Sequence, residues 1–331
     1  MKAIVLFSGG LDSTLAIKVI LDEGIEVEAL NFFTPFCLCD RNSGCGAKAK
    51  SIKDEWGVKL KVFPLSDEYL NMIKNPKHGY GSSMNPCIDC RILMYKKAKE
   101  YMNEIGASFI VSGEVLGQRP MSQHKRALMI TEKESGLEGL ILRPLSAKLL
   151  PITIPEKEGW VKREKMLEIS GRSRKPQIEL ASDYNIKDFP CSAGGCLLTD
   201  AGFSRRIRDL IKHSEFNMAN IELLKVGRHF RLTEKAKVAV GRNEKENKRL
   251  ENLRRPGDMY FHPIENNGPM AVGRGKIGKE EIDIITRVVA RYCDRNGSKK
   301  VKIAVNAWPG EVKSIVAAAP INDAELDRLR I

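Results

Sequence analysis

The feature that most constrains the fold is the alternation of short apolar runs with helical segments over the first 145 residues. Strands are expected at 2–7, 25–32, 58–65, 107–114 and 137–145, and helices at 13–24, 49–57 and 90–106 between them. Strands that alternate with helices predict an α/β fold with a parallel, doubly wound sheet. Ligands of such sheets bind beyond the carboxyl ends of the strands.

The alternation ends near residue 144, which indicates a second part with a different architecture. Residues 144–200 are rich in Pro, Lys and Arg, and we expect them to form a mostly helical extension that completes a first domain, 1–200. A linker is expected at 213–220. Short strands and one helix then predict a second, smaller α+β domain over 220–331.

Charge is distributed unevenly between these parts. The chain has a formal net charge of +13, and residues 201–331 hold 27 Lys and Arg against 17 Asp and Glu. This excess is either a solvated basic surface or an electrostatic footprint for a polyanion. No apolar run approaches the roughly 20 residues that span a bilayer, and the first residues are too short for a signal peptide. We therefore expect a cytoplasmic protein without a membrane partner.

The eight cysteines are grouped, which a disulfide framework does not explain in a reducing compartment. The groups are Cys37 and Cys39 with Cys45 nearby, then Cys87 and Cys90, and then Cys191 and Cys196. Cys293 stands alone in a helical stretch and is interpreted as a core thiol. Grouped cysteines in a cytosolic chain indicate metal binding or catalysis.

The Cys87-x-x-Cys90 pair follows a proline and precedes a helical run. By itself it is compatible with a redox dithiol, half of a zinc site, part of an iron–sulfur site or coincidence. A redox dithiol is the weaker interpretation, because the pair is not at the end of a thioredoxin-like first strand.

The segment Ser8–Thr14 joins the first strand directly to a helix. Gly9 and Gly10 allow the backbone to approach a ligand, and the start of the helix offers unpaired N–H groups that suit phosphates. Asp12 in such a site indicates an accompanying Mg²⁺ ion or hydroxyl group. The segment is neither a Walker loop nor a G-x-G-x-x-G turn. The alternative is a plain glycine turn in which Asp12 caps the helix.

The run SGGLDS from Ser8 to Ser13 resembles the SGGxDS signature of the ATP pyrophosphatase (PP-loop) family. This family includes GMP, asparagine and NAD synthetases, 7-cyano-7-deazaguanine synthase and the tRNA thiouridine synthetases. Its members release pyrophosphate and transfer AMP to an oxygen atom. The resemblance implies an adenine nucleotide alpha-hydrolase-like fold and a site for ATP and Mg²⁺, with Asp12 as a catalytic residue. The implied ATP-binding residues are Ser8, Gly9, Gly10, Leu11, Asp12, Ser13 and Thr14.

A second block, SGEVLGQRPMSQ at 112–123, resembles the segment after the fourth strand of the 4-thiouridine synthetases. It implies further ATP contacts by Ser112, Gly113, Glu114 and Gln118. The alternative is a plain strand-to-helix turn.

Some members of this family carry a Cys-x-x-Cys pair and a third cysteine roughly a hundred residues later, which together hold a [4Fe–4S] cluster. The resemblance implies that Cys87, Cys90 and Cys196 are ligands and catalytic residues, with Cys191 as the alternative third ligand. A persulfide-carrying cysteine and a zinc or inert pair remain alternatives. For the first cysteine group, zinc binding, cluster support and surface thiols all stay open.

The segment 225–263 resembles the NFACT-R RNA-binding domain. The RNA-binding residues that this resemblance implies are Arg242, Lys248, Arg249, Arg254 and Arg255. Phe261 and His262 are expected to stack on a base.

These resemblances predict an ATP-dependent tRNA sulfurtransferase that adenylates a uridine carbonyl of tRNA and replaces its oxygen by sulfur. The N-terminal RNA-binding module and the C-terminal sulfur-transfer domain of the 4-thiouridine synthetases find no counterpart in the sequence. Their absence leaves the target uridine open and favours a cluster mechanism with sulfide or an external donor such as a cysteine desulfurase. A homodimer also stays open. The alternatives are a synthetase like 7-cyano-7-deazaguanine synthase and a non-enzymatic RNA-binding factor with a vestigial ATP loop.

Overall fold

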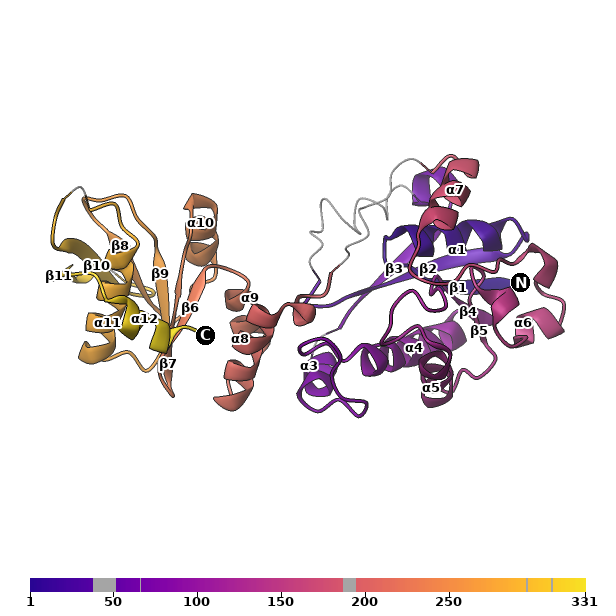
Figure 1. Cartoon of the computed structure of the whole chain (residues 1–331), viewed down its shortest axis with the longest axis horizontal. Helices are drawn as coiled ribbons and strands as arrows, with labels where there is room; N and C mark the ends of the chain where they lie inside the picture. Colours follow the sequence, from indigo (N-terminus) through magenta and orange to yellow (C-terminus); the bar gives the residue numbers. More distant parts are fainter. Residues whose placement is uncertain (38–51, 66, 187–194, 296, 311) are drawn as a thin grey trace. The chain divides into compact units, whose positions relative to one another are not determined.

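The computed structural model describes the 331 residues apart from 38–51, 66, 187–194, 296 and 311 (Figure 1). The chain divides into two compact units, Met1–Asp200 and Ala201–Ile331. The segment expected as a linker is instead the connection between two helices of the second unit, α8 (Ala201–Lys212) and α9 (Met218–Leu224).

The first unit is built on a five-stranded parallel sheet in the order β3-β2-β1-β4-β5. Its strands are β1 (Lys2–Leu6), β2 (Glu26–Phe33), β3 (Lys59–Pro64), β4 (Phe109–Ser112) and β5 (Ile141–Leu142). The strand order reverses between the neighbours β1 and β4, and ligands of open α/β sheets bind at such a switch point. The predicted doubly wound parallel sheet is confirmed.

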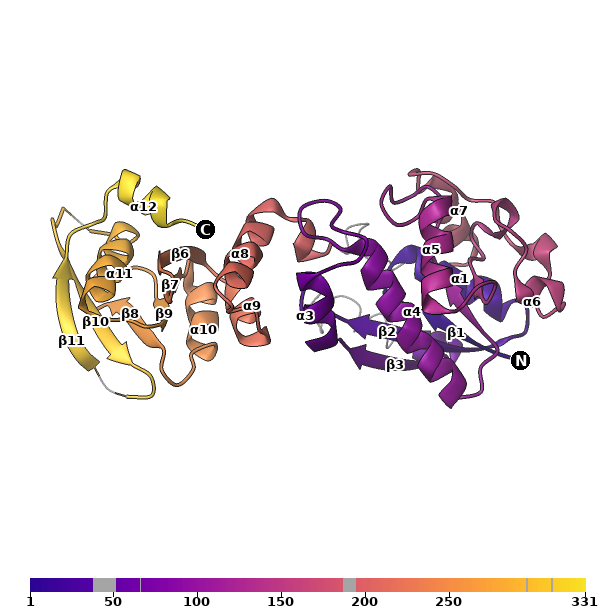
Figure 2. The ribbon, with the colours of Figure 1, turned by 90° about the horizontal axis from the view of Figure 1, so that it is seen from below.

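Helices cover both faces of this sheet, with α1 and α7 on one face and α4 and α5 on the other (Figures 1 and 2). Their bounds are α1 (Leu11–Leu21), α3 (Asp67–Lys74), α4 (Cys87–Glu104), α5 (Lys125–Ser135), α6 (Ile154–Lys157) and α7 (Lys175–Asp183). Successive residues of β1 alternate between the faces, so that Val5 packs in the core beside α1 and Ile4 in the core beside α4.

The extension at 144–200 is less helical than the sequence indicated. It contains only the short elements η1 (Ala147–Leu149), α6, η2 (Arg163–Lys165), α7 and η3 (Leu197–Thr199) among its described residues. Prolines interrupt the segment and remove backbone donors. Hydrogen bonds from side chains replace the missing helix bonds: the Ser146 hydroxyl donates to the carbonyl oxygen of Ile169 at 2.6 Å and accepts from the backbone N–H of Leu116 at 3.0 Å.

The second unit is a six-stranded antiparallel sheet in the order β11-β10-β8-β9-β7-β6. Its strands are β6 (Arg228–Thr233), β7 (Ala236–Val240), β8 (Met259–Pro263), β9 (Ala271–Gly275), β10 (Val301–Ala307) and β11 (Val312–Ala318). The expected α+β domain is present, but β9 and the helices α10 (Glu244–Asn252) and α12 (Asp323–Leu329) were not expected.

Helices cover both faces of the antiparallel sheet as well. Val238 and Val240 of β7 pack in the core with Ile285 of α11 (Lys279–Arg291). Ala239, between them, points to the opposite face and packs with residues of α9 and α10, such as Leu250. Within the described ranges, no helix is both long enough and apolar enough to cross a membrane.

Candidate active site

The predicted catalytic residues of the first unit gather at the carboxyl edge of the parallel sheet. The glycine loop follows β1, Cys37 follows β2, and the second predicted loop follows β4. Helix α4 runs back from this edge toward the start of β4, so its first turn, with Cys87 and Cys90, lies there too. Because all strands are parallel, one edge collects every one of these segments.

The glycine loop is shaped by backbone conformation and by its own hydroxyl groups. Gly9 has a φ angle of 75°, which favours glycine, and Gly10 is the N-cap of α1. The Ser13 and Thr14 hydroxyls donate to the Gly10 carbonyl oxygen at 2.9 and 3.0 Å. Leu11 is buried in the core, so only its backbone can face a ligand. The cap is Gly10, and the interpretation of Asp12 as a capping residue is therefore wrong.

The second loop packs directly against the first. A Cβ atom on Gly113 would lie 2.6 Å from the backbone nitrogen of Ser13, so only glycine allows this approach. The Gln118 side-chain amide donates to Asp12 Oδ2 at 3.1 Å. The structure therefore brings together the two loops that the sequence predicted to share a nucleotide.

Helix α7 supplies a third wall that the sequence analysis missed. Gln177 is fully buried, and its side-chain amide lies close enough to Asp12 to lower the pKa of that carboxyl. Among the described residues, Asp12 Oδ1, Gln123 Oε1 and Arg174 Nε are buried atoms without a hydrogen bond of good geometry. Buried polar atoms are normally paired, and a group of unpaired ones is a sign of a ligand site. The basic, proline-containing segment before α7 was the only signal for this wall.

Asp12 contacts Gln118 of the second loop and lies near Arg174 at the start of α7. Burial raises the pKa of the Asp12 carboxyl, while Gln118, and then the charges of Arg174 and Arg119, act in the opposite direction. A carboxylate held between cationic side chains, with one oxygen that lacks a hydrogen bond of good geometry, can bind a cation that accompanies phosphates.

Glu114 lies under the second loop in a buried ion cluster. Its carboxylate accepts from the Tyr95 hydroxyl at 2.7 Å and from Arg143 Nε at 3.1 Å, and Arg91 Nε lies 3.2 Å away. Burial alone would raise the pKa of Glu114, but Arg91 and Arg143 outweigh it and hold that pKa below its ordinary value. This carboxylate is thus committed to holding Arg91, a geometry that favours positioning over direct contact with ATP.

The Cys-x-x-Cys pair occupies the first turn of α4. Asp89, between the two cysteines, accepts from the backbone N–H groups of Lys77 and His78 at 2.9 and 3.0 Å, which ties the preceding loop to the helix. The Cys90 thiol donates to the Tyr69 hydroxyl at 3.6 Å. The positive end of a helix dipole favours thiolates at such positions.

Two further cysteines are brought to the same place. Cys37 and Cys196 face each other in an isolated antiparallel bridge, supported by the bond from Leu197 N–H to the Phe36 carbonyl at 2.9 Å. The Met84 N–H donates to the Leu198 carbonyl at 3.1 Å, which joins the bridge to the segment before α4. The structure therefore places Cys196 beside the pair, and it adds Cys37, for which the sequence left several roles open.

The four thiols influence one another electrostatically. Burial raises the pKa of Cys90 to about 11 and of Cys196 to about 12, and the charge of Cys37 adds to both increases. Burial also raises the pKa of Cys87, against the opposing charges of Arg91 and Arg119. Buried neutral thiols would need a cation to become thiolates, which is the chemistry of a metal-binding donor set.

The donor set fits a thiolate-bound metal by type, because all four side chains are thiols. Within the described residues, however, no three His, Cys, Asp or Glu side chains form a group that could hold a metal ion. Cys39, Cys45 and Cys191 lie outside the described residues.

Arg119 connects the glycine loop with the thiols. Its charge acts on Asp12 in the loop and on Cys87 at the start of α4. The glycine loop and the first turn of α4 thus both lie within range of the Arg119 charge. Arg119 lies in the second loop but was not among the residues predicted from the sequence.

In the second unit, the predicted RNA-binding residues occupy different environments. Arg242 and Lys248 are exposed, and Lys248 pairs with Glu244 at 2.7 Å. Arg249 and Arg255 are exposed at and beyond the end of α10. The Arg254 guanidinium lies over two aromatic rings, 4.5 Å from the Tyr260 centroid and 4.1 Å from that of Trp308.

The two residues expected to stack on a base lie in different environments. Phe261 is completely buried in the core, so the expectation that it stacks on RNA is wrong. His262 is half-buried and stacks on Tyr260, with ring centroids 6.0 Å apart. Tyr260 and Trp308 are the aromatic side chains that β8 and the end of β10 present with it.

Two family models match this chain. Residues 1–149 match the thiamine biosynthesis protein (ThiI) family, and residues 227–330 match the NFACT protein RNA binding domain. Both resemblances drawn from the sequence are therefore confirmed. The segment 201–226, which includes α8 and α9, precedes the second match.

Curated relatives match part of the chain. The tRNA sulfurtransferase of Desulfurococcus amylolyticus is 30% identical over 144 residues, which cover 44% of this chain and 29% of that protein. The tRNA-specific 2-thiouridylase MnmA of Sulfurimonas denitrificans is 29% identical over 123 residues, which cover 35% of each. The chain thus spans about a third of the length of these relatives. Among solved structures, the U34-tRNA thiolase NcsA of Methanococcus maripaludis with its [4Fe–4S] cluster is 21% identical, with a TM-score of 0.34, over 68% of this chain and 73% of that one.

Proposed function

We propose that this chain, whose two parts match the ThiI and NFACT RNA-binding families, is an ATP-dependent tRNA sulfurtransferase. It forms a bond between the α-phosphate of ATP and a carbonyl oxygen of a uridine in tRNA, and pyrophosphate leaves. Sulfide then forms the C–S bond, and the C–O bond breaks as AMP departs with the oxygen. The product is a thiouridine of the 4-thio or 2-thio type, and the site of action is cytoplasmic.

One observation carries the proposal: the glycine loop and the thiols lie at the same sheet edge, and Arg119 acts on both Asp12 and Cys87. An oxygen can then be made a leaving group next to the place where sulfur is held. Positioning of this kind accounts for a large share of the rate of two-substrate reactions.

The residues of the nucleotide site have distinct roles. The backbone N–H groups at the start of α1 bind the pyrophosphate part of ATP, and Gly9 and Gly113 allow the loops to come close enough. Asp12 Oδ1, which is buried without a hydrogen bond of good geometry in the described structure, would hold Mg²⁺, and the ion would neutralise phosphate charge. Arg119 and Arg174 add positive charge beside Asp12.

The thiols hold the sulfur source. Cys87, Cys90 and Cys196 would hold a [4Fe–4S] cluster, with Cys191 as the alternative third ligand, and such a cluster would supply a site for sulfide. Arg91, fixed by Glu114, faces the pair and stabilises its thiolate form. Sulfide or a cysteine desulfurase supplies the sulfur, and the basic second unit binds the tRNA.

The test combines metal analysis with product analysis on the full chain. After anaerobic purification, we expect iron and acid-labile sulfide, tRNA-dependent release of pyrophosphate, and thionucleosides in digested tRNA. The variants Cys87→Ser and Cys90→Ser should lose the iron and the thionucleosides. Cys293→Ser is the matched control, because Cys293 is a buried thiol in the second unit, and it should keep both.

Other results would identify a different protein. Zinc without iron, together with pyrophosphate release but no thionucleoside, would support a synthetase like 7-cyano-7-deazaguanine synthase. Failure to release pyrophosphate with any tRNA, combined with tight tRNA binding, would support an RNA-binding factor with a vestigial ATP loop.

A further inference from the structure

A second basic site lies in the second unit, outside the aromatic surface of β8 and β10. A hollow of about 360 Å³ is lined by arginines from four separate segments. They are Arg205 and Arg206 of α8, Arg228 at the start of β6, Arg242 after β7, and Arg330 after α12. We call this hollow the arginine pocket. None of the described residues that line it is Asp or Glu.

Two of these arginines are held in place by the protein. The Arg228 guanidinium stacks 4.3 Å from the Tyr292 ring centroid and donates to the Gly241 carbonyl at 3.1 Å. Arg206 donates to the Leu224 carbonyl at 3.0 Å. The ring face and the backbone oxygen that Arg228 contacts do not neutralise the positive charge of its guanidinium group. A rigid guanidinium fork that keeps its charge is well suited to binding phosphate oxygens.

The positive field is felt by a neighbouring group. His229, which also lines the pocket, is buried; burial, and then the charges of Arg206, Lys237 and Arg242, lower the pKa of His229 to about 3. The counter-charges of two pocket arginines lie to the side: Glu246 is 3.4 Å from Arg242, and Asp327 is 3.7 Å from Arg330. An anion in the pocket would relieve the mutual repulsion of the five guanidinium groups.

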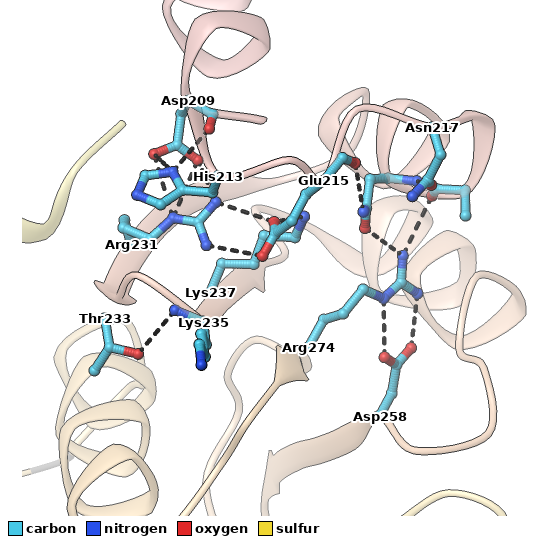
Figure 3. Close-up of polar contacts among 12 residues, drawn as sticks. Asp209, His213, Glu215, Asn217, Arg231, Thr233, Lys235, Lys237, Asp258 and Arg274 are labelled. Atoms are coloured by element: carbon cyan, nitrogen blue, oxygen red, sulfur yellow. Dashed lines mark hydrogen bonds and ion pairs between the residues drawn. The ribbon is translucent and has the colours of Figure 1, made fainter. Parts of the chain in front are cut away.

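A network of charged side chains joins helix α8 to the antiparallel sheet (Figure 3). This network holds Arg205 and Arg206 of α8 beside the arginines of the sheet. Asp209 of α8 pairs with Arg231 of β6, and Arg231 also contacts Glu215 at 3.1 Å. Lys237 of β7, which is almost completely buried, donates to Glu215 at 2.6 Å. Buried ion pairs of this kind are strongly destabilised when one partner is removed. The network therefore presents Arg205 and Arg206 to the pocket.

We infer that the arginine pocket binds a phosphate group of the RNA backbone. This inference rests on the proposed function only in taking RNA as the partner. A pocket in the range of small-molecule sites accommodates one phosphate with its sugar, and its arginines can donate to several phosphate oxygens. Part of the pocket comes from α8, outside the segment that matches the RNA-binding family model, so it extends the RNA surface of that domain.

The test compares two double variants of the full chain with equal net charge. Arg205→Gln with Arg242→Gln removes two exposed pocket arginines, and Lys302→Gln with Lys313→Gln removes two exposed lysines of β10 and β11, at the other edge of the sheet. Binding of tRNA is measured by fluorescence anisotropy between 50 and 200 mM salt. We expect the pocket variant to bind about 10-fold more weakly, with a salt slope smaller by about 2, and the control to differ less than 2-fold from the original.

Further titrations distinguish an RNA phosphate from a free phosphate ion as the ligand of the pocket. Inorganic phosphate and pyrophosphate are titrated alone, and we expect only millimolar binding that the pocket variant loses. If the two double variants bind tRNA equally well, the inference is wrong even though RNA binding stands. If the variants differ only in binding free pyrophosphate, the pocket serves that ion and the RNA assignment fails. If the unchanged protein does not bind tRNA, the proposed function fails first.

Discussion

The two sheets organise function in opposite ways. In the parallel sheet, all strands end on the same side, and segments distant in sequence, such as Gly9, Cys37 and Gly113, follow strand ends there. In the antiparallel sheet, neighbouring strands run in opposite directions, so their carboxyl ends alternate between the two ends of the sheet. No single end therefore collects the loops. Its candidate contacts lie instead on strand side chains, such as Tyr260, and on helices added around the sheet.

Buried charge shows the same contrast. In the first unit, Glu114 lies beneath the reactive edge and holds Arg91 toward the thiols. In the second unit, Glu215 joins Arg231 and Lys237 to a helix connection and so fixes an element of the scaffold. Similar ion clusters thus position a side chain beside the thiols in one unit and attach a helix connection to the sheet in the other. Variants should therefore separate activity from RNA binding according to the unit in which they lie.

The largest effect is expected from Gly113→Ala. The new Cβ would lie 2.6 Å from Ser13 N and would force the two loops apart. Since displacements near 1 Å at a reacting centre can reduce rates about 100-fold, we expect pyrophosphate release to fall by about that factor. RNA affinity of the second unit should stay within about 2-fold, measured by anisotropy.

Gly24→Ala is the control for this change. Gly24 has a φ angle of 74°, a Cβ added there would meet nothing within 4 Å, and the residue lies before β2 at the opposite end of that strand. The substitution should lower stability by about 1–2 kcal/mol through backbone strain alone and retain the rate. Equal loss of activity in both variants would mean that general stability, and not loop contact, controls the reaction.

The next effect is on stability and its pH dependence. Glu114→Gln leaves Arg91 with a neutral partner, while Arg143 keeps its ion pair with Glu132, and the change should cost about 3–5 kcal/mol of unfolding free energy. Because the pKa of Glu114 is lowered in the folded protein, its contribution is present above the ordinary Glu pKa of 4.5 and is lost as the pH falls below it. Denaturant unfolding between pH 7 and pH 3 should therefore show a smaller acid-induced loss in the variant than in the original protein. Parallel curves would contradict the charged state of Glu114.

How much of this could be predicted from the sequence differs between the units for physical reasons. The parallel sheet and its first loop were predictable, because continuous apolar runs and the SGGLDS motif are local signals. The roles of Cys37 and Gln177 were not, because they come together with the loop only through the tertiary fold. Which residues of β8 face solvent also required the structure, since strand alternation by itself does not tell which face is buried; this is why Phe261 was wrongly expected to bind RNA.

A smaller effect is expected from the aromatic surface of the second unit. Trp308→Ala removes a ring that stacks on Arg254 and is partly exposed. If this surface stacks a base, the free energy of binding single-stranded RNA should become less favourable by about 1–3 kcal/mol. The rate of pyrophosphate release at saturating tRNA should stay unchanged. Phe261→Leu is the contrasting change, because it affects the core and should lower the unfolding midpoint without a specific loss of RNA affinity. If Phe261→Leu lowered RNA affinity and Trp308→Ala did not, RNA would bind at a surface other than the aromatic side chains of β8 and β10.

The smallest effect is expected from Lys248→Gln. Lys248 is exposed on α10 and pairs with Glu244, an exposed partner four residues earlier, so the unfolding midpoint should not change measurably. If Lys248 also contacts an RNA phosphate, the slope of log affinity against log salt should decrease by about 1, with equal weakening for all RNA sequences. Glu244→Gln frees the same lysine and should strengthen binding slightly. If the salt slope is unchanged in both variants, α10 lies outside the RNA surface. RNA binding would then be confined to the arginine pocket and the aromatic side chains, which separates the contribution of this helix from that of the strands.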